Sequence, residues 1–227
     1  MEPIMANPYN PLGTPPPRVP FTQPTSLYRY GEVTVWSTFQ LPAAAIVNST
    51  NRLFTTPRGQ VGQGFGAALT LAQTSIKEGG RVPSGLAYDV FGLSCDITES
   101  NGVALQTGAN INDLVNIQRG GVLQWDFVQT IVDIAPVMLV GAGGGAFGAL
   151  GNAAALGNMN NGNGAIFMYR KSPVALPGGC TFSVQLVMGG NATGVLVAPG
   201  PSVPALASAK DVRVSLFGYY KSVIEIA

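Results

Sequence analysis

The chain has 227 residues, of which 46% are hydrophobic and only 10% are charged, against roughly 25% charged in ordinary soluble domains. Its 12 basic and 11 acidic residues leave a formal net charge of +1, which excludes the basic field that direct binding to nucleic acid requires. The shortage of charge predicts extensive burial between subunits, with a merely neutral surface on a monomer as the alternative.

Residues 1–26 predict an extended arm. They hold eight of the 17 prolines and only two charged residues, and so many prolines exclude helix and interior strand. Their hydrophobic side chains suit a groove on a neighbouring subunit, and a disordered leader is the alternative. The residues expected to line this subunit interface are Tyr9, Leu12, Pro16 and Phe21.

The β pattern begins near Tyr28 and ends before Pro42, which cannot donate to a ladder. Residues 50–66 predict one short strand and a loop rich in Gly and Gln. A further strand is expected around Leu69 and Leu71, which are flanked by smaller residues.

A charged turn at residues 77–83 leads into a strong strand over residues 90–97. There the alternation predicts that Phe91 faces the core and Val90 faces away from it. The period then changes to that of a helix over residues 110–119, which a pair of glycines ends.

Strands return at residues 123–127 and at residues 130–140, the latter bent at its proline. The stretch 164–190 contains the clearest alternation and is typical of a strand, a Pro/Gly loop and a second strand. Residues 212–216 form the last clear strand. About eight strands with one short helix predict an all-β sandwich or barrel. The core residues expected in it are Phe91, Leu93, Trp125, Phe127, Phe182, Val184 and Leu216.

Candidate chemistry is scarce. The sequence has no histidine, which removes histidine triads, proton shuttles and metal ligands.

Cys95 and Cys180 are expected to be free buried thiols, with a disulfide between them as the alternative. The carboxylates that could pair for acid–base work are Asp89 with Asp96 and Asp126 with Asp133. Because Asp96 and Asp126 fall on polar faces of strands, we expect them to be solvated; the sequence thus predicts no enzyme, no metal and no cofactor.

Residues 134–169 contain no charged residue. The part from 134 to 157 is long enough to span a membrane, but its seven glycines and one proline make a weak span. We expect a strand followed by a low-complexity loop, and membrane contact is the alternative.

Two C-terminal segments, FMYRKSPVALPGGCTFSVQLVM and DVRVSLFGYYKSVIEIA, follow the proline-rich arm and the strands that are poor in charge. Together these features resemble the jelly-roll coat proteins of tailless icosahedral DNA bacteriophages, with those that contain an internal membrane nearest in character. The resemblance covers roughly residues 85–227. It implies that residues 27–227 form a single eight-stranded jelly roll whose flat sides tile a shell.

The resemblance implies a viral capsid protein that self-assembles into an icosahedral shell, in a virion assembled in the host cytoplasm. The implied partners are copies of the chain and other virion proteins; an internal lipid membrane would be contacted through residues 134–169. The almost uncharged arm implies no direct contact with nucleic acid. The alternative is a cellular ligand- or carbohydrate-binding β-sandwich, which would need exposed aromatic residues around a pocket.

The arm provides a test of assembly. Deleting residues 2–24 should leave a soluble β-rich protein, because the strand pattern starts only near Tyr28. That protein should assemble poorly or into particles of the wrong size, since a pre-stiffened docking segment is lost. Circular dichroism measures the β content and light scattering the particle size; normal particles from the truncated chain would contradict the role of the arm.

Overall fold

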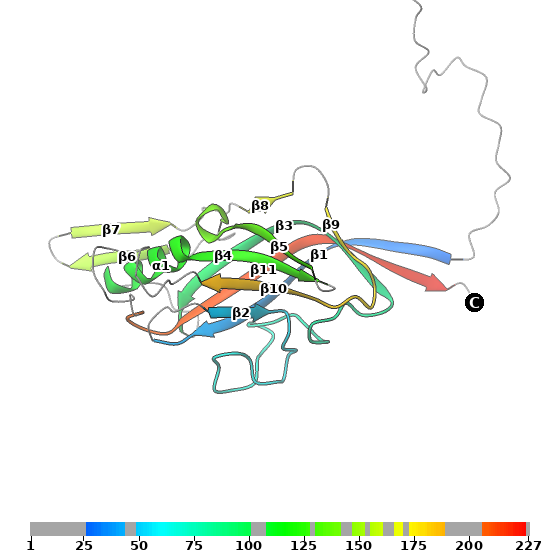
Figure 1. Ribbon diagram of the computed structural model, residues 1–227, viewed down its shortest axis with the longest axis horizontal. Helices are drawn as coiled ribbons and strands as arrows, with labels where there is room; N and C mark the ends of the chain where they lie inside the picture. The colour runs from blue at the N-terminus through cyan, green and yellow to red at the C-terminus, as the bar shows by residue number, and fades with distance from the viewer. Residues whose placement is uncertain are drawn as a thin grey trace, which may run out of the picture.

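The computed structural model describes most of the chain between residues 26 and 225. The described residues are 26–43, 49–100, 108–127, 130–141, 147–152, 155–160, 166–169, 173–188 and 206–225. They are mostly β and form two antiparallel sheets, with one α-helix at an end of the pair (Figure 1). This arrangement agrees with the predicted all-β sandwich.

The first sheet has the strand order β1-β11-β3-β8, and β9 also pairs with β3. Its strands are β1 (Ser26–Leu41), β3 (Leu86–Glu99), β8 (Phe167–Met168), β9 (Val174–Leu176) and β11 (Lys210–Glu225). β1 and β11 are antiparallel partners over all 16 residues of each strand. Ser26, the last residue of the expected arm, is thus the first residue of this ladder.

The second sheet has the order β2-β10-β4-β5. Its strands are β2 (Ser49–Leu53), β4 (Gly121–Phe127), β5 (Thr130–Pro136) and β10 (Phe182–Met188). The predicted bend at Pro136 is confirmed, because β5 ends there and the 3-10 helix η2 (Val137–Leu139) follows. The clear alternation of the 164–190 stretch is confirmed in β10, whose Val184 and Leu186 are fully buried.

The predicted helix is confirmed as α1 (Gly108–Gly120). Its Leu114 and Ile117 are fully buried. Gly121 begins β4 directly after the helix, where a Cβ would lie 2.8 Å from the Ile117 carbonyl oxygen and 2.9 Å from the side chain of Leu186. The pair of glycines therefore ends the helix and also lets β4 approach the core.

The core lies between the two sheets and contains most of the residues predicted for it. Leu93, Trp125, Phe182, Val184 and Leu216 are buried, and Phe127 packs half-buried against them. The Phe182 ring lies 5.7 Å from that of Phe54 and 6.4 Å from that of Trp125, measured between centroids.

Phe91 was predicted in this core and is not there. Phe217 pairs with Gly92 but Gly218 pairs with Val90, so Phe91 is an extra residue in β3, a β-bulge. The bulge reverses the alternation: Val90 is buried, and Phe91 is half-buried with its ring centroid 5.3 Å from that of Tyr219.

The strand predicted at Leu69 and Leu71 is also absent, because residues 54–85 form a long loop with isolated bridges. The loop hydrogen-bonds along the free edge of β1. Ser75 N donates to the Trp36 carbonyl at 3.0 Å, and Gln40 N donates to the Gln63 carbonyl at 3.0 Å. The loop thus satisfies an exposed strand edge without forming a strand itself.

The described residues contain eleven strands, where the sequence predicts about eight. Part of the surplus comes from the segment predicted to be a low-complexity loop, in which β6 (Phe147–Asn152) and β7 (Ala155–Asn160) pair as a hairpin. The short strand β9 is a further addition, whereas β8 lies in the 164–190 stretch, where a strand was expected. No helix within the described residues is long and apolar enough to cross a membrane.

The placement of the two phenylalanines can be tested by truncation. Phe182→Ala should lower the free energy of unfolding by about 3–5 kcal/mol, because a packed core ring is removed. Phe91→Ala should cost about 1 kcal/mol, since its ring is half-buried outside the core. Urea unfolding followed by circular dichroism measures both; equal losses would mean that the bulge is wrongly placed.

Candidate functional site

The four residues predicted to anchor the arm, Tyr9, Leu12, Pro16 and Phe21, lie outside the described residues. The ladder to which the arm connects is described, and β1 and β11 run out together at one end of the molecule (Figure 1). Tyr30 on this ladder is 63% exposed, and the Lys221 ammonium lies 6.0 Å from the centroid of its ring. This ladder, which begins at Ser26, therefore carries an exposed aromatic side chain near its end.

Four exposed large apolar side chains lie on β5, an outer strand of the second sheet, and on η2, which follows it. We call Ile131, Val132, Met138 and Leu139 the apolar edge; each is between 44% and 65% exposed. Within the described residues β5 pairs only with β4, so its other side presents free backbone groups. An unpaired strand edge beside apolar side chains is a template for another chain.

The anchoring of η2 at both ends turns two of its three side chains outward. Pro136 ends β5, and the Val140 amide closes the turn by donating to the Val137 carbonyl at 3.0 Å. Val137 and Val140 are buried and anchor the turn, so Met138 and Leu139 between them face solvent. Since both ends of the turn are held, burying these two side chains within the same chain would require rebuilding it.

A polar pocket of about 360 Å³ lies on the first sheet beneath the 54–85 loop. Its described lining residues are Thr38, Thr70, Ala72, Gln73, Asp96, Thr98, Asp211 and Arg213. Arg213 ties the sheet to the loop, because its Nη2 donates to the Ala72 carbonyl at 2.9 Å and its Nε to Thr38 Oγ1 at 3.3 Å. None of the described lining residues is aromatic, so the pocket lacks the stacking surface expected of a carbohydrate site.

Asp96 was predicted to be solvated, and the structure corrects this. Its Oδ1 is buried without a hydrogen-bond partner in the pocket wall. Burial raises the pKa of the Asp96 carboxyl, and the neighbouring Arg213 guanidinium opposes the rise only in part. The cause is the loop above, which sequence periodicity could not place over this face.

Asp126 is also held rather than solvated. It accepts hydrogen bonds from Gln185 Nε2 at 2.6 Å and from Ser183 Oγ at 3.3 Å, and Arg52 Nη2 lies 3.8 Å away. Asp133 instead accepts from Gln124 at 2.6 Å. Each carboxylate of this candidate pair is therefore engaged by a different glutamine, and Asp89 and Asp96 lie apart along β3; neither arrangement is an acid–base pair.

Both cysteines are free. Cys95 is buried as predicted, and burial together with the nearby Asp96 charge raises the pKa of its thiol to about 12. Cys180 was predicted to be buried but is only half-buried, because it precedes β10 in the loop after Gly179. Burial raises the pKa of the Cys180 thiol as well, so neither group is poised as a nucleophile.

Comparison with known proteins gives no identification: no protein-family model, no curated protein and no solved structure matches the chain. Within the described ranges, no three Cys, Asp or Glu side chains group as metal ligands. The features of the protein that bear on its function are therefore the apolar edge, the strand order and the polar clusters.

The raised pKa of Asp96 predicts a pH dependence. A carboxyl group whose pKa is higher in the folded state binds more protons in that state than in the unfolded chain. The free energy of unfolding of the wild type should therefore fall as the pH rises from the pKa of Asp in the unfolded chain, about 3.9, through the raised pKa of Asp96 in the folded protein. Asp96→Asn removes this titration. The variant should therefore gain stability relative to wild type between acidic and neutral pH, measured by urea unfolding at each pH. Asp89→Asn, at an exposed position of the same strand, controls for the loss of one negative charge; a relative loss in Asp96→Asn on raising the pH would contradict the assignment.

Proposed function

We propose that the chain is a structural protein of a viral capsid, which assembles with copies of itself and other virion proteins into an icosahedral shell. The proposed location is the virion, with assembly in the host cytoplasm. The observation that carries the proposal is the strand order of the two sheets; the apolar edge and the low charge support it independently.

The strand order supports an eight-stranded jelly roll. β8 and β9 pair with successive parts of β3 and count as one interrupted strand, and the hairpin β6–β7 is an insertion. The remaining pairs are nested: β1 with β11, β2 with β10, β3 with β8 and β9, and β4 with β5. The first strand thus pairs with the last and the second with the last but one, with successive pairs in alternate sheets. A long hairpin rolled into two sheets has this connectivity, and jelly rolls of this kind build viral capsids as well as lectins and cupins.

The apolar edge supports self-association over a solitary binding module. Its four exposed large side chains lie on η2 and on β5, which has no partner on its outer side among the described residues, and exposed apolar surface of this kind often marks protein contacts. With a net charge of +1, the chain has no excess of positive charge that would attract a polyanion such as nucleic acid. We therefore assign β5 and η2 to protein contacts within the shell, with direct binding to nucleic acid excluded from the proposal.

Residues 134–169 include η2 and the β6–β7 hairpin. Contact with an internal lipid membrane through this uncharged segment stays part of the proposal for capsids that contain one. The alternative function, a cellular ligand- or carbohydrate-binding module, finds little support in a polar pocket whose described lining carries no aromatic ring.

Two leucines make a matched test. Leu139, on the apolar edge, is 65% exposed, and Leu71, in the loop over the first sheet, is 54% exposed. Leu139→Glu should reduce the assembled fraction strongly, because each contact would bury a charge. Leu71→Glu should assemble as the wild type does.

Light scattering on the purified full chain measures the mass of the assemblies. The wild type should form a large closed particle or a ring. A wild type that stays monomeric would favour the ligand-binding alternative, and a Leu139→Glu variant that assembles normally would remove the apolar edge from the contact.

A further inference from the structure

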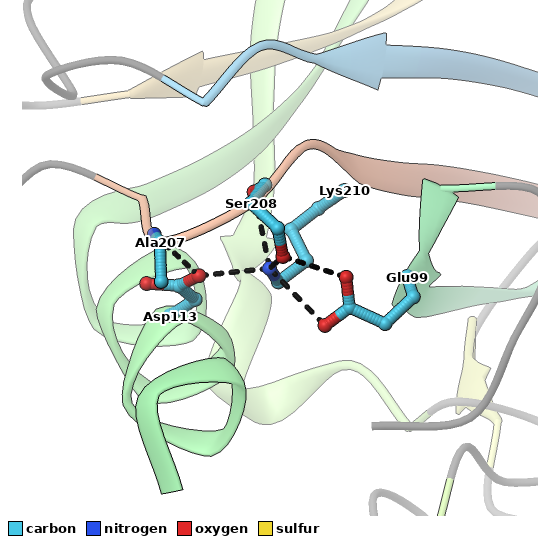
Figure 2. Close-up of polar contacts among 5 residues, drawn as sticks. All are labelled: Glu99, Asp113, Ala207, Ser208 and Lys210. Atoms are coloured by element: carbon cyan, nitrogen blue, oxygen red, sulfur yellow. Dashed lines mark hydrogen bonds and ion pairs between the residues drawn. The ribbon is translucent and has the colours of Figure 1, made fainter. Parts of the chain in front are cut away.

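A fully buried lysine lies where the helix meets the first sheet. Lys210 Nζ is 2.8 Å from Asp113 Oδ2 on α1 and 3.3 Å from Glu99 Oε1 at the end of β3 (Figure 2). The side chains of Lys210, Asp113 and Glu99 are 0%, 3% and 15% exposed. The start of β11 thus brings one amine to two carboxyl groups from β3 and α1, which lie about 100 positions earlier in the chain, in a site where only Glu99 retains some exposure.

We propose that Lys210 and Asp113 condense into an isopeptide bond within the folded chain. This proposal is independent of the capsid function, because it uses only the interior of one chain. An interior ion pair loses much of its Coulombic gain to desolvation. Amide formation uses the pair as a neutral amine and a neutral acid, which a proton transfer from the ammonium to the carboxylate in contact with it produces.

The geometry favours attack of the lysine on Asp113. The nitrogen already touches the carboxyl group, and a bound pair of this kind reaches effective molarities of about 10⁵–10⁸ M. The Ala207 amide donates to Asp113 Oδ2 at 2.8 Å, so a backbone N–H is in place to stabilise negative charge on that oxygen in the tetrahedral intermediate. The same site excludes the bulk water that would favour hydrolysis.

The step balances without a further reactant. The lone pair of neutral Lys210 Nζ attacks Cγ of the protonated Asp113 carboxyl, and the C–N bond forms. The C–O bond to the other carboxyl oxygen then breaks, and that oxygen leaves as water. The products are one secondary amide and one water molecule, with no change of oxidation state.

Glu99 is placed to relay the proton. Its Oε1 lies 3.3 Å from Nζ, within reach to accept a proton from the attacking nitrogen and return it to the leaving oxygen. Ser208 positions this carboxylate, because its Oγ donates to Glu99 Oε2 at 2.6 Å while accepting from Lys210 Nζ. Glu99 ends the reaction unchanged.

Asp113 is the acyl partner and Glu99 the relay for two reasons. Asp113 is closer to the nitrogen and more deeply buried than Glu99. It also receives the Ala207 N–H. The bond would join α1 to the start of β11 and close a loop of about 100 residues, which limits the unfolded chain as a disulfide does.

The first test is the mass of the denatured, purified full chain. The wild type should be lighter than its sequence mass by one water molecule. Trypsin should release residues 82–119 joined to residues 172–213, with Lys210 uncleaved, and fragment ions should place the bond at Asp113. A wild type at its full sequence mass with free residues 172–210, or a bond located at Glu99, would overturn the proposal.

Two variants separate chemistry from packing. Glu99→Gln keeps the size and an acceptor for Ser208 but cannot relay the proton, so bond formation should slow by about 10²–10⁴-fold. Its native circular dichroism and full mass at harvest would support the relay, and complete cross-linking would overturn it. Lys210→Arg keeps the cation without the nucleophile and should never lose water; should it fail to fold, the wild-type mass still decides the proposal.

Discussion

The pairing of β1 with β11 is the constraint on which the rest of the structure depends. These two strands begin and end the described chain and are partners over 16 residues each. β11 lies between β1 and β3, so these two strands are joined in one sheet only when β11, the last strand in the sequence, pairs with both. The same register sets Lys210 opposite both Leu41 and Glu99. The two ladders of β11 thus complete the first sheet and place Lys210 beside Glu99 in the buried polar cluster. Such long-range pairing carries a large loop-closure entropy and makes folding slow.

The outer edges of the two sheets differ in whether other parts of the chain cover them. The edge of β1 is covered by the 54–85 loop, whose backbone hydrogen-bonds to Trp36 and Gln40. Among the residues that the structure describes, no strand pairs with the outer edge of β5, and the outward-facing Met138 and Leu139 follow it. A covered edge prevents indiscriminate sheet growth, and an open one directs association to a single side. This asymmetry fits the ordered assembly that we propose.

Sequence reasoning succeeded where one local period dominates. The alternation over residues 180–188 and the helical spacing before Gly120 both predicted elements that the structure contains. It failed at Phe91, because a bulge inserts one residue and the partner strand that defines it is more than a hundred positions away. It failed at Leu69 and Leu71 because hydrogen bonds to β1, rather than local propensity, determine the path of that loop.

The candidate sites were harder to predict than the fold. Pro136 marked the bend, but only the burial of Val137 and Val140 shows that the residues between them face outward. Lys210, at the start of a strand, is indistinguishable in sequence from a surface lysine. Its partners Asp113 and Glu99 come from a helix and a different strand, and no spacing rule connects the three. Clusters assembled by tertiary contact leave no local pattern to find.

The placement of the charged residues strengthens the inference drawn from their number. Only 10% of the chain is charged, and Asp113, Lys210 and Asp211 of that small set are buried. Asp96 and Asp126 are held in polar clusters at the sheet faces. The number of charged groups at the surface is therefore smaller than the 23 in the sequence. A neutral surface offers little electrostatic repulsion between copies, so shape and apolar contact decide how they meet. In the capsid subunit that we propose, the polar contacts that position the elements lie inside the fold, where they hold the helix and the first sheet together.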